Sequence, residues 1–308
     1  MTTNFKSYIE LLDHFKDQQT CIEHLENQRW NGNPYCPFCK HEKVYKTNRG
    51  YKCANPECYK KFTVTTKSVF ENTKIPLRYF FAAIFLLAGH KKGVSSHQLG
   101  RDLNVTQKTA WFILHRIREM LKEKAPLMLR NEVEIDETYI GGKEKNKHKN
   151  KRTEGTQGRS TLTKAPVLAI LERNGKVIVR PIVDTKAETI IPIMVEKVEK
   201  GSTIYTDENR SYRSLKKNNY KHQFVKHNLG EYVVGVAHTN NCEGFFSHLK
   251  RSIIGINHSV SPKHLSRYCD AQAFRWNTRK ESESDRFNTV LNQCAGRLKY
   301  EELIANPK

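Results

Sequence analysis

The sequence predicts a mixed α/β domain that is preceded by two small N-terminal modules. Beyond residue 130, short apolar runs that alternate with polar residues are followed by longer helical patterns, which is typical of a mixed sheet covered by helices. Before that point, the chain carries four closely spaced cysteines and then two helical patterns joined by a short turn. With 308 residues, it has room for about two domains, or for one core with small additions.

The composition is strongly basic, with 53 Lys and Arg against 32 Asp and Glu and a net charge of +21. This excess indicates a polyanionic partner, for which nucleic acid is the first candidate and an acidic membrane surface the second. The longest apolar run, residues 79–89, is much shorter than the ~20 residues of a membrane-spanning helix, and the N-terminus has no signal-peptide pattern. We therefore expect a protein of a reducing compartment, whose eight cysteines are thiols or metal ligands.

The first helices are indicated by apolar residues at helical spacing. Residues 5–29 predict one amphipathic helix, which the Gly- and Pro-containing segment 30–35 ends. After the cysteine-rich stretch, Pro76 opens a second predicted helix that continues through Leu87. Gly93 ends this region.

Four cysteines between residues 36 and 58 follow the spacing C-x2-C-x13-C-x4-C. Each pair lies on a tight turn, and two such turns can present four thiolates in the tetrahedral geometry that suits Zn²⁺. A region of about thirty residues builds little core, so the metal would supply its folding energy. We interpret the module as a zinc ribbon that binds DNA or protein, rather than as four unrelated thiols. Its ligands to a structural Zn²⁺ are Cys36, Cys39, Cys53 and Cys58.

Two helical patterns, residues 95–103 and 106 to about 123, predict a helix-turn-helix with its turn at 103–105. The start of the second helix would meet base edges in the major groove, and basic residues further along it would reach phosphates. The alternative is an ordinary helical pair with a basic, solvated face. The candidate base contacts are Gln107, Lys108 and Thr109, and the candidate phosphate contacts are His115, Arg116 and Arg118.

The elements of the α/β domain follow in order. A strand over 133–140 precedes a polar, Lys-rich stretch at 143–164 that we expect to be a mobile loop. Two apolar runs that flank Arg173-Asn174-Gly175 predict a hairpin. A helix closed by Gly201 and a strand over 202–207 come next. Four further helices are predicted, at about 209–218, 240–253, 262–279 and 285–302.

Three acidic residues occupy informative places in this pattern. Asp136 lies in the first strand of the domain, where Glu134 shares its face because side chains alternate along a strand. Asp207 ends a later strand, and sites in open α/β sheets lie near such ends. Glu243 opens a helix, and Lys250 follows on the same face, two turns or about 10 Å away.

Three carboxylates and a lysine are typical of metal-assisted phosphoryl transfer. Two hard cations such as Mg²⁺, about 3.5–4 Å apart, need shared oxygen ligands, and a lysine can hold a DNA phosphate. The order strand, strand, helix is that of an RNase H-like core, in which a later parallel strand pairs beside the first. That pairing would bring Asp136 and Asp207 side by side.

Several long motifs then carry a resemblance to a known family. Besides the cysteine module and the segment 91–118, they are E-I-D-E-T-Y-I-G-G-K, Y-T-D-E-N, H-T-N-N-C-E-G-F-F-S-H-L-K-R and S-P-K-H-L-S-R-Y-C-D-A-Q-A-F-R-W-N-T-R. The chain resembles, from about Leu12 to Leu298, the bacterial insertion-sequence transposases that have an N-terminal zinc ribbon and a DDE catalytic core. The resemblance implies that Asp136, Asp207 and Glu243 form the catalytic triad and that Lys250 is the basic residue that follows it. Some relatives have Asn at the position of Glu243.

The resemblance implies a transposase that cuts DNA at the ends of its element and joins the freed 3′ hydroxyl to target DNA. The acidic triad would hold two Mg²⁺ ions, for which Mn²⁺ can substitute, and Lys250 and Arg251 would contact DNA. Its partners would be terminal inverted repeats, target DNA and a second copy of the chain on paired ends, with no membrane. The compartment would be the bacterial cytoplasm, at the nucleoid.

Other functions are compatible with parts of the pattern. A DNA-binding transcription regulator with a zinc ribbon and a helix-turn-helix explains the charge but leaves the acids without a role. An RNase H-like nuclease without strand transfer differs only in its product, and a domesticated transposase only in its genomic context. On the transposase interpretation, the predicted domains are an N-terminal helix at 1–30, a zinc ribbon at 31–66, a helix-turn-helix region at 74–125 and an RNase H-like catalytic domain at 130–300.

Overall fold

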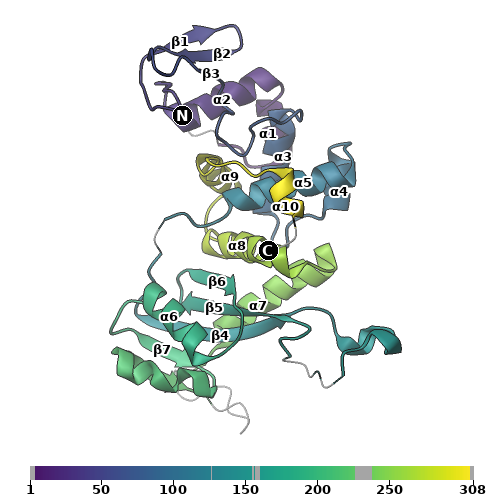
Figure 1. Ribbon diagram of the computed structural model, residues 1–308, viewed down its shortest axis with the longest axis vertical. Helices are drawn as coiled ribbons and strands as arrows, with labels where there is room; N and C mark the ends of the chain where they lie inside the picture. Colours follow the sequence, from purple (N-terminus) through teal and green to yellow (C-terminus); the bar gives the residue numbers. More distant parts are fainter. Residues whose placement is uncertain (1–3, 126, 155, 157–159, 226–237, 306–308) are drawn as a thin grey trace. The chain divides into compact units, whose positions relative to one another are not determined.

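The computed structural model describes residues 4–125, 127–154, 156, 160–225 and 238–305 (Figure 1). The chain divides into two compact units, one of Met1–Lys122 with Lys280–Lys308 and one of Glu123–Arg279. The second unit thus ends before residue 300, where the sequence analysis ends the catalytic domain, because the last helices pack with the N-terminal ones. No helix among the described residues has the length and apolar character to cross a membrane.

The N-terminal segment forms two helices rather than the single one predicted. α1 spans Tyr8–His14 and α2 spans Gln18–Trp30. The prediction was wrong because Asp17 starts a new helix: its side chain accepts a hydrogen bond from the Thr20 amide at 2.8 Å. α3, Leu77–Gly89, is buried along nearly its whole length and contacts α1, α2 and α9 (Glu283–Asn292).

A small antiparallel sheet follows α2 and consists of β1 (Val44–Thr47), β2 (Gly50–Cys53) and β3 (Lys61–Phe62). Gly50 has a φ of +127°, and a Cβ atom there would lie 2.5 Å from the Phe62 carbonyl oxygen, so the turn requires glycine. Trp30 at the end of α2 packs edge-on against Tyr51 and Phe62 of this sheet. The sheet is therefore fixed to α2.

The predicted helical pair is present as α4 (Ser96–Asp102) and α5 (Gln107–Met120), with Ser95 and Thr106 as N-caps. The C-terminal region, predicted as one helix at 285–302, contains α9 and the short α10 (Tyr300–Ile304) instead. The prediction was wrong because the intervening segment is extended: the Val69 amide donates to the Cys294 carbonyl at 2.9 Å, and Gly296 has a φ of +111°.

The second unit is built on a five-stranded sheet of order β6-β5-β4-β7-β8; Figure 1 labels β6, β5, β4 and β7 of this sheet. β4 pairs antiparallel with β5, which pairs antiparallel with β6, whereas β7 runs parallel to β4 and β8 runs parallel to β7. This mixed order is that of the RNase H-like fold, as the sequence predicts. The strands span Glu132–Ile140 (β4), Ala165–Glu172 (β5), Val177–Pro181 (β6), Thr203–Thr206 (β7) and Lys221–Phe224 (β8).

Helices cover both faces of this sheet. One face packs against α6 (Ala187–Lys197) and the 3-10 helix η3 (Arg210–Asn218), which the sequence predicts as an α-helix. The other face packs against α7 (Asn240–Ser252) and α8 (Pro262–Asn277). The Lys-rich loop begins with two short 3-10 helices, η1 (Glu144–Asn146) and η2 (Lys149–Lys151); its residues 155 and 157–159 lie outside the described residues.

Candidate active site and zinc site

The four predicted zinc ligands come together in the ribbon. Their sulfur atoms all lie within 4.8 Å of one another, with Sγ–Sγ distances of 3.8 Å for Cys36–Cys58 and 3.5 Å for Cys39–Cys53. A tetrahedron with Zn–S bonds of ~2.3 Å has edges of about 3.8 Å, so the cluster fits a structural Zn²⁺. Hydrogen bonding, chiefly from the backbone of His41, lowers the pKa of Cys39 to about 7, whereas burial raises the pKa of Cys53 to about 12.

Asp136 lies on β4, and Asp207 directly follows the neighbouring parallel strand β7. The observed register pairs Glu134 of β4 with Tyr205 of β7, and Asp136 and Asp207 each come two residues after this pair. Both aspartates are half-buried. Asp136 Oδ1 accepts a hydrogen bond from the Glu137 amide at 2.8 Å, and Asp207 Oδ1 accepts one from the Asn209 amide at 3.0 Å.

Glu243 lies in the first turn of α7, and Lys250 lies in its last turn; both side chains are exposed. Glu134 faces α7, as its hydrogen bonds to Asn241 and Cys242 show, and Asp136 therefore faces α7 as well. The three acids thus belong to one side of the sheet.

The charges of these carboxylates affect the pKa values of two buried side chains, Cys242 and Tyr212. Burial raises the pKa of the Cys242 thiol well above its ordinary value, and the charges of nearby carboxylates raise it further: Asp136, Glu134, Glu137 and Glu243. Burial also raises the pKa of Tyr212 well above its ordinary value, to which the charges of Glu137, Asp136 and Asp207 add. Asp136 is therefore an electrostatic neighbour of the segments that carry both other acids.

The three carboxylates are nevertheless not closed around a common point. Among the described residues, the cysteine cluster is the only group of three or more potential ligands whose atoms all lie within 4.8 Å of one another. Three carboxylates that close together would repel one another through their negative charges, and a bound divalent cation would offset this repulsion. The structure thus brings β4 into contact with β7 and with α7, but among the described residues it does not bring the three carboxylates within 4.8 Å of one another.

The predicted base contacts lie on the surface at the start of α5. Gln107 and Lys108 are exposed and Thr109 is half-buried. Gln107 donates to Ser96 Oγ at 2.8 Å, which links the two helices of the pair, and the Lys108 ammonium lies 5.1 Å from the centre of the Tyr300 ring.

The prediction of phosphate contacts further along α5 was wrong, because the side chains of His115, Arg116 and Arg118 are buried. The His115 ring lies 4.4 Å from that of Trp111. The Arg116 guanidinium lies 4.5 Å from the centre of the Phe112 ring, and burial lowers its pKa. These cationic and imidazole groups contribute to packing rather than to the surface.

Four further residues at this site have roles that no sequence motif indicates: Glu134, Glu137, Arg173 and Tyr212. Tyr212 of η3 donates a hydrogen bond to Glu137 of β4, which ties the segment after Asp207 to the strand of Asp136. Glu134 of β4 accepts hydrogen bonds from Asn241 and Cys242, which ties the start of α7 to the same strand. The available signal was the run of acids in E-I-D-E, on a strand that is otherwise apolar.

Comparisons with known proteins agree with this arrangement. Residues 128–277 match the ISXO2-like transposase domain, and residues 16–61 match the transposase zinc-ribbon domain. The chain belongs to this family of insertion-sequence transposases. The family assignment covers the β4–α8 region and the ribbon, which are the two parts that hold the candidate ligands.

Individual relatives include a protein in the transposable element ISH50 of Halobacterium salinarum, 29% identical over 293 residues, which are 90% of this chain and 97% of the relative. A transposase-like protein of Haemophilus influenzae is 28% identical over 94 residues, 30% of this chain and 75% of the relative. Among solved structures, the Mos1 transposase paired-end complex with the left transposon end is 14% identical with a TM-score of 0.28, covering 74% of this chain and 82% of that one.

Removal of the zinc should unfold the ribbon, because the metal replaces most of its missing core. We expect Cys39→Ser to lose bound zinc and to shift the fluorescence of Trp30, which packs on the ribbon sheet. Metal analysis and tryptophan fluorescence measure both effects. Cys21→Ala, outside the cluster, is the control and should keep one zinc per chain; equal zinc content in the two variants would contradict the ligand assignment.

Proposed function

We propose that this chain catalyses metal-dependent cleavage of DNA at the ends of its insertion sequence and transfer of the freed 3′ hydroxyl to target DNA. The observation that supports the proposal is the parallel pairing of β4 with β7, because Asp136 and Asp207 each follow the paired residues Glu134 and Tyr205 by two positions. Glu243 joins them from the first turn of α7. A regulator that only binds DNA has no use for this arrangement.

Each part of the site has a distinct task in this proposal. Asp136, Asp207 and Glu243 supply carboxylate oxygens, the ligand type that Mg²⁺ prefers and Mn²⁺ accepts. A bound cation of this kind activates an attacking oxygen and stabilises a leaving one. Lys250, exposed at the far end of α7, and its neighbour Arg251 lie where they can hold DNA phosphates.

The helical pair α4–α5 is the proposed reader of the element's ends. Its second helix presents Gln107, Lys108 and Thr109 at its N-terminus, the part of a helix-turn-helix that meets base edges. Because Gln107 is already bonded to Ser96 Oγ, its amide is held in a fixed orientation. Transfer of both ends of an element needs two active sites, so we propose that two copies of the chain act together on paired ends.

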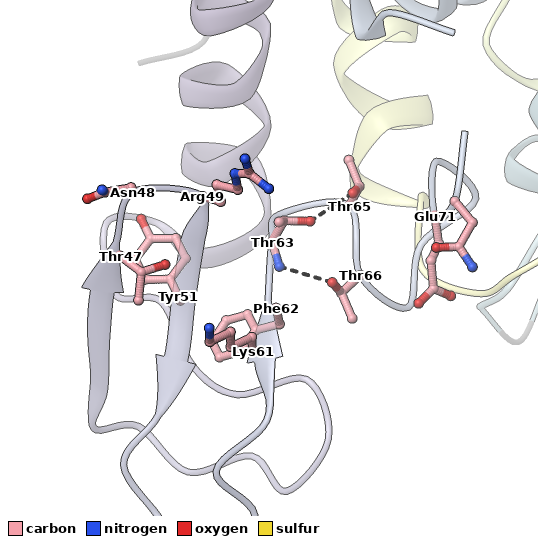
Figure 2. Close-up of a pocket in the computed structure, with 11 residues that line it drawn as sticks. Thr47, Asn48, Arg49, Tyr51, Lys61, Phe62, Thr63, Thr65, Thr66 and Glu71 are labelled. Carbon is pink, nitrogen blue, oxygen red and sulfur yellow. Dashed lines mark hydrogen bonds between the residues drawn. The ribbon is translucent and has the colours of Figure 1, made fainter. Parts of the chain in front are cut away.

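The ribbon offers a second DNA contact. A depression of about 820 Å³ lies between the β1–β2 turn and the segment that follows β3; Figure 2 shows the residues that line it. Arg49 and Lys61 bring positive charge to it, and the hydroxyl groups of Thr63, Thr65 and Thr66 line one wall. Arg29 of α2 donates to the backbone carbonyls of this wall. Glu71 also lines the depression, so its charge is mixed, with Arg49 and Lys61 outnumbering this one acid. Cations and hydroxyls of this kind suit the sugar–phosphate backbone rather than an apolar protein segment.

The catalytic assignment predicts that Asp136→Asn lowers cleavage at the terminal repeat by roughly 10²–10³-fold, because a carboxylate ligand is lost. A labelled terminal-repeat duplex, incubated with Mg²⁺ or with EDTA, measures nicking and strand transfer. Glu196→Gln, an exposed acid on α6, is the control and should cleave normally. Full strand transfer by Asp136→Asn with intact DNA binding would show that the site lies elsewhere.

The recognition assignment predicts that Gln107→Ala weakens binding to the terminal repeat by about 1–3 kcal/mol and reduces discrimination against a scrambled duplex. Fluorescence anisotropy on the two duplexes measures both quantities. Lys200→Ala removes an exposed positive charge from the other unit and should leave discrimination unchanged. An equal loss on both duplexes would make Gln107 a backbone contact.

The ribbon contact predicts that Arg49→Ala combined with Lys61→Ala lowers the salt slope of DNA binding by about two, since each lost phosphate contact removes ~0.9. The slope is measured as log Kd against log salt concentration. Lys46→Ala, on β1 outside the depression, is the matched control. An unchanged slope in the double variant would exclude the depression as a DNA contact.

A further inference from the structure

Glu134 is a fully buried carboxylate in the strand that carries Asp136. A buried charge is costly unless hydrogen bonds and an opposite charge compensate it. Here Arg173 Nε donates to Glu134 Oε1 at 2.8 Å, and Asn241 Nδ2 donates to the same oxygen at 2.8 Å. His238 Nδ1 lies 3.2 Å from this oxygen. Glu134 is thus held on several sides at once.

The other oxygen of Glu134 binds the start of α7. Glu134 Oε2 accepts hydrogen bonds from the backbone amides of Asn241 at 2.9 Å and Cys242 at 3.2 Å. The first amides of a helix have no partner within it, and the N-cap residue Thr239 provides no side-chain hydrogen bond. Glu134 therefore caps α7 from a different element, and its negative charge suits the positive end of the helix dipole.

Arg173 extends this contact to the strand of Asp207. Its guanidinium lies 3.9 Å from the centre of the Tyr205 ring and donates to the His238 carbonyl at 3.1 Å. Tyr205, two residues before Asp207, donates to Glu132 Oε1 at 2.6 Å. One connected cluster therefore joins β4, β7 and α7, the elements that carry the three proposed catalytic acids.

We propose that Glu134, held by Arg173, is a positioning residue that fixes Glu243 relative to Asp136 and Asp207, an inference that rests on the proposed function. Glu243 directly follows Cys242, whose amide Glu134 binds, so a shift of this amide moves Glu243 with it. Three carboxylates that repel one another need such a constraint to remain within reach of common cations. A carboxylate is required, because it accepts on both oxygens and carries the charge that Arg173 balances.

The decisive variant is Glu134→Gln. It keeps the size of the side chain but replaces one accepting oxygen with an NH2 group, which can only donate, although the groups around it are themselves donors. We expect cleavage at saturating DNA to fall at least tenfold and the half-saturating Mg²⁺ concentration to rise at least fivefold. The Kd for the terminal repeat should change less than twofold, because the recognition surface is elsewhere. Glu172→Gln, the neighbour of Arg173 on β5, is the matched control and should behave like the parent chain.

A second readout does not depend on activity. Fe²⁺ in place of Mg²⁺, with ascorbate and peroxide, generates hydroxyl radicals that cut the protein backbone beside the bound ion. In the parent chain we expect cuts near residues 136, 207 and 243. In Glu134→Gln, the cut near 243 should be lost and those near 136 and 207 retained. Should the single variant fail to fold, Glu134→Gln combined with Arg173→Met removes both buried charges and is examined in the same way.

The outcomes separate this inference from the proposed function. Normal rate, normal Mg²⁺ dependence and an unchanged cutting pattern in Glu134→Gln would overturn the positioning role while an inactive Asp136→Asn leaves the catalytic assignment intact. A uniform loss of all three cuts would also overturn it, since it would show a collapsed site rather than a displaced α7. If the parent chain neither cleaves DNA nor is cut by Fe²⁺, both proposals fail together.

Discussion

The parallel pairing of β4 with β7 is the constraint on which the rest of the candidate site depends. It aligns Glu134 with Tyr205, so that an aspartate follows two residues later in each of two distant parts of the chain, a result that neither strand can produce alone. Glu134 and Asp136 lie on the same side of β4, because side chains alternate along a strand. This is the side of the sheet that α7 covers. α7 packs on that face, and the first turn of α7 donates a hydrogen bond to Glu134.

Much of this arrangement can be predicted from the sequence, because strands leave a period-two pattern and hairpins a turn signal. The strand of Asp136, the hairpin around Asn174 and Gly175, and the four zinc ligands follow from such local rules. β8 gives no such signal, because it is short, polar and largely exposed at the edge of the sheet. The breaks within 5–29 and 285–302 depend on a cap and on a pairing with distant residues, which local periodicity does not contain.

The charge pattern of the sequence likewise does not show which single residues are exposed. Arg116 and Arg118 look like surface cations in the sequence, yet both are buried, and Arg116 stacks on Phe112 four residues earlier in α5. Lys108 lies in the same helix and is exposed. The difference arises from what packs against each side of α5, which requires the fold of the whole unit. A basic helix therefore predicts a nucleic-acid partner better than it predicts the contacting residues.

The acids on the α7 face divide into two kinds that the sequence does not distinguish. Glu134 has both oxygens bound by Arg173, Asn241 and the start of α7, whereas Asp136 and Asp207 each accept a hydrogen bond from a backbone amide that follows them closely in the chain. A carboxylate that is already neutralised by a guanidinium is a poor ligand for a cation, since binding it would require breaking that network. Without Arg173, Glu134 would keep its hydrogen bonds to α7 but would lose its guanidinium partner two residues from Asp136. The network therefore has two consequences: it holds the start of α7 in place, and it withholds Glu134 from a divalent ion.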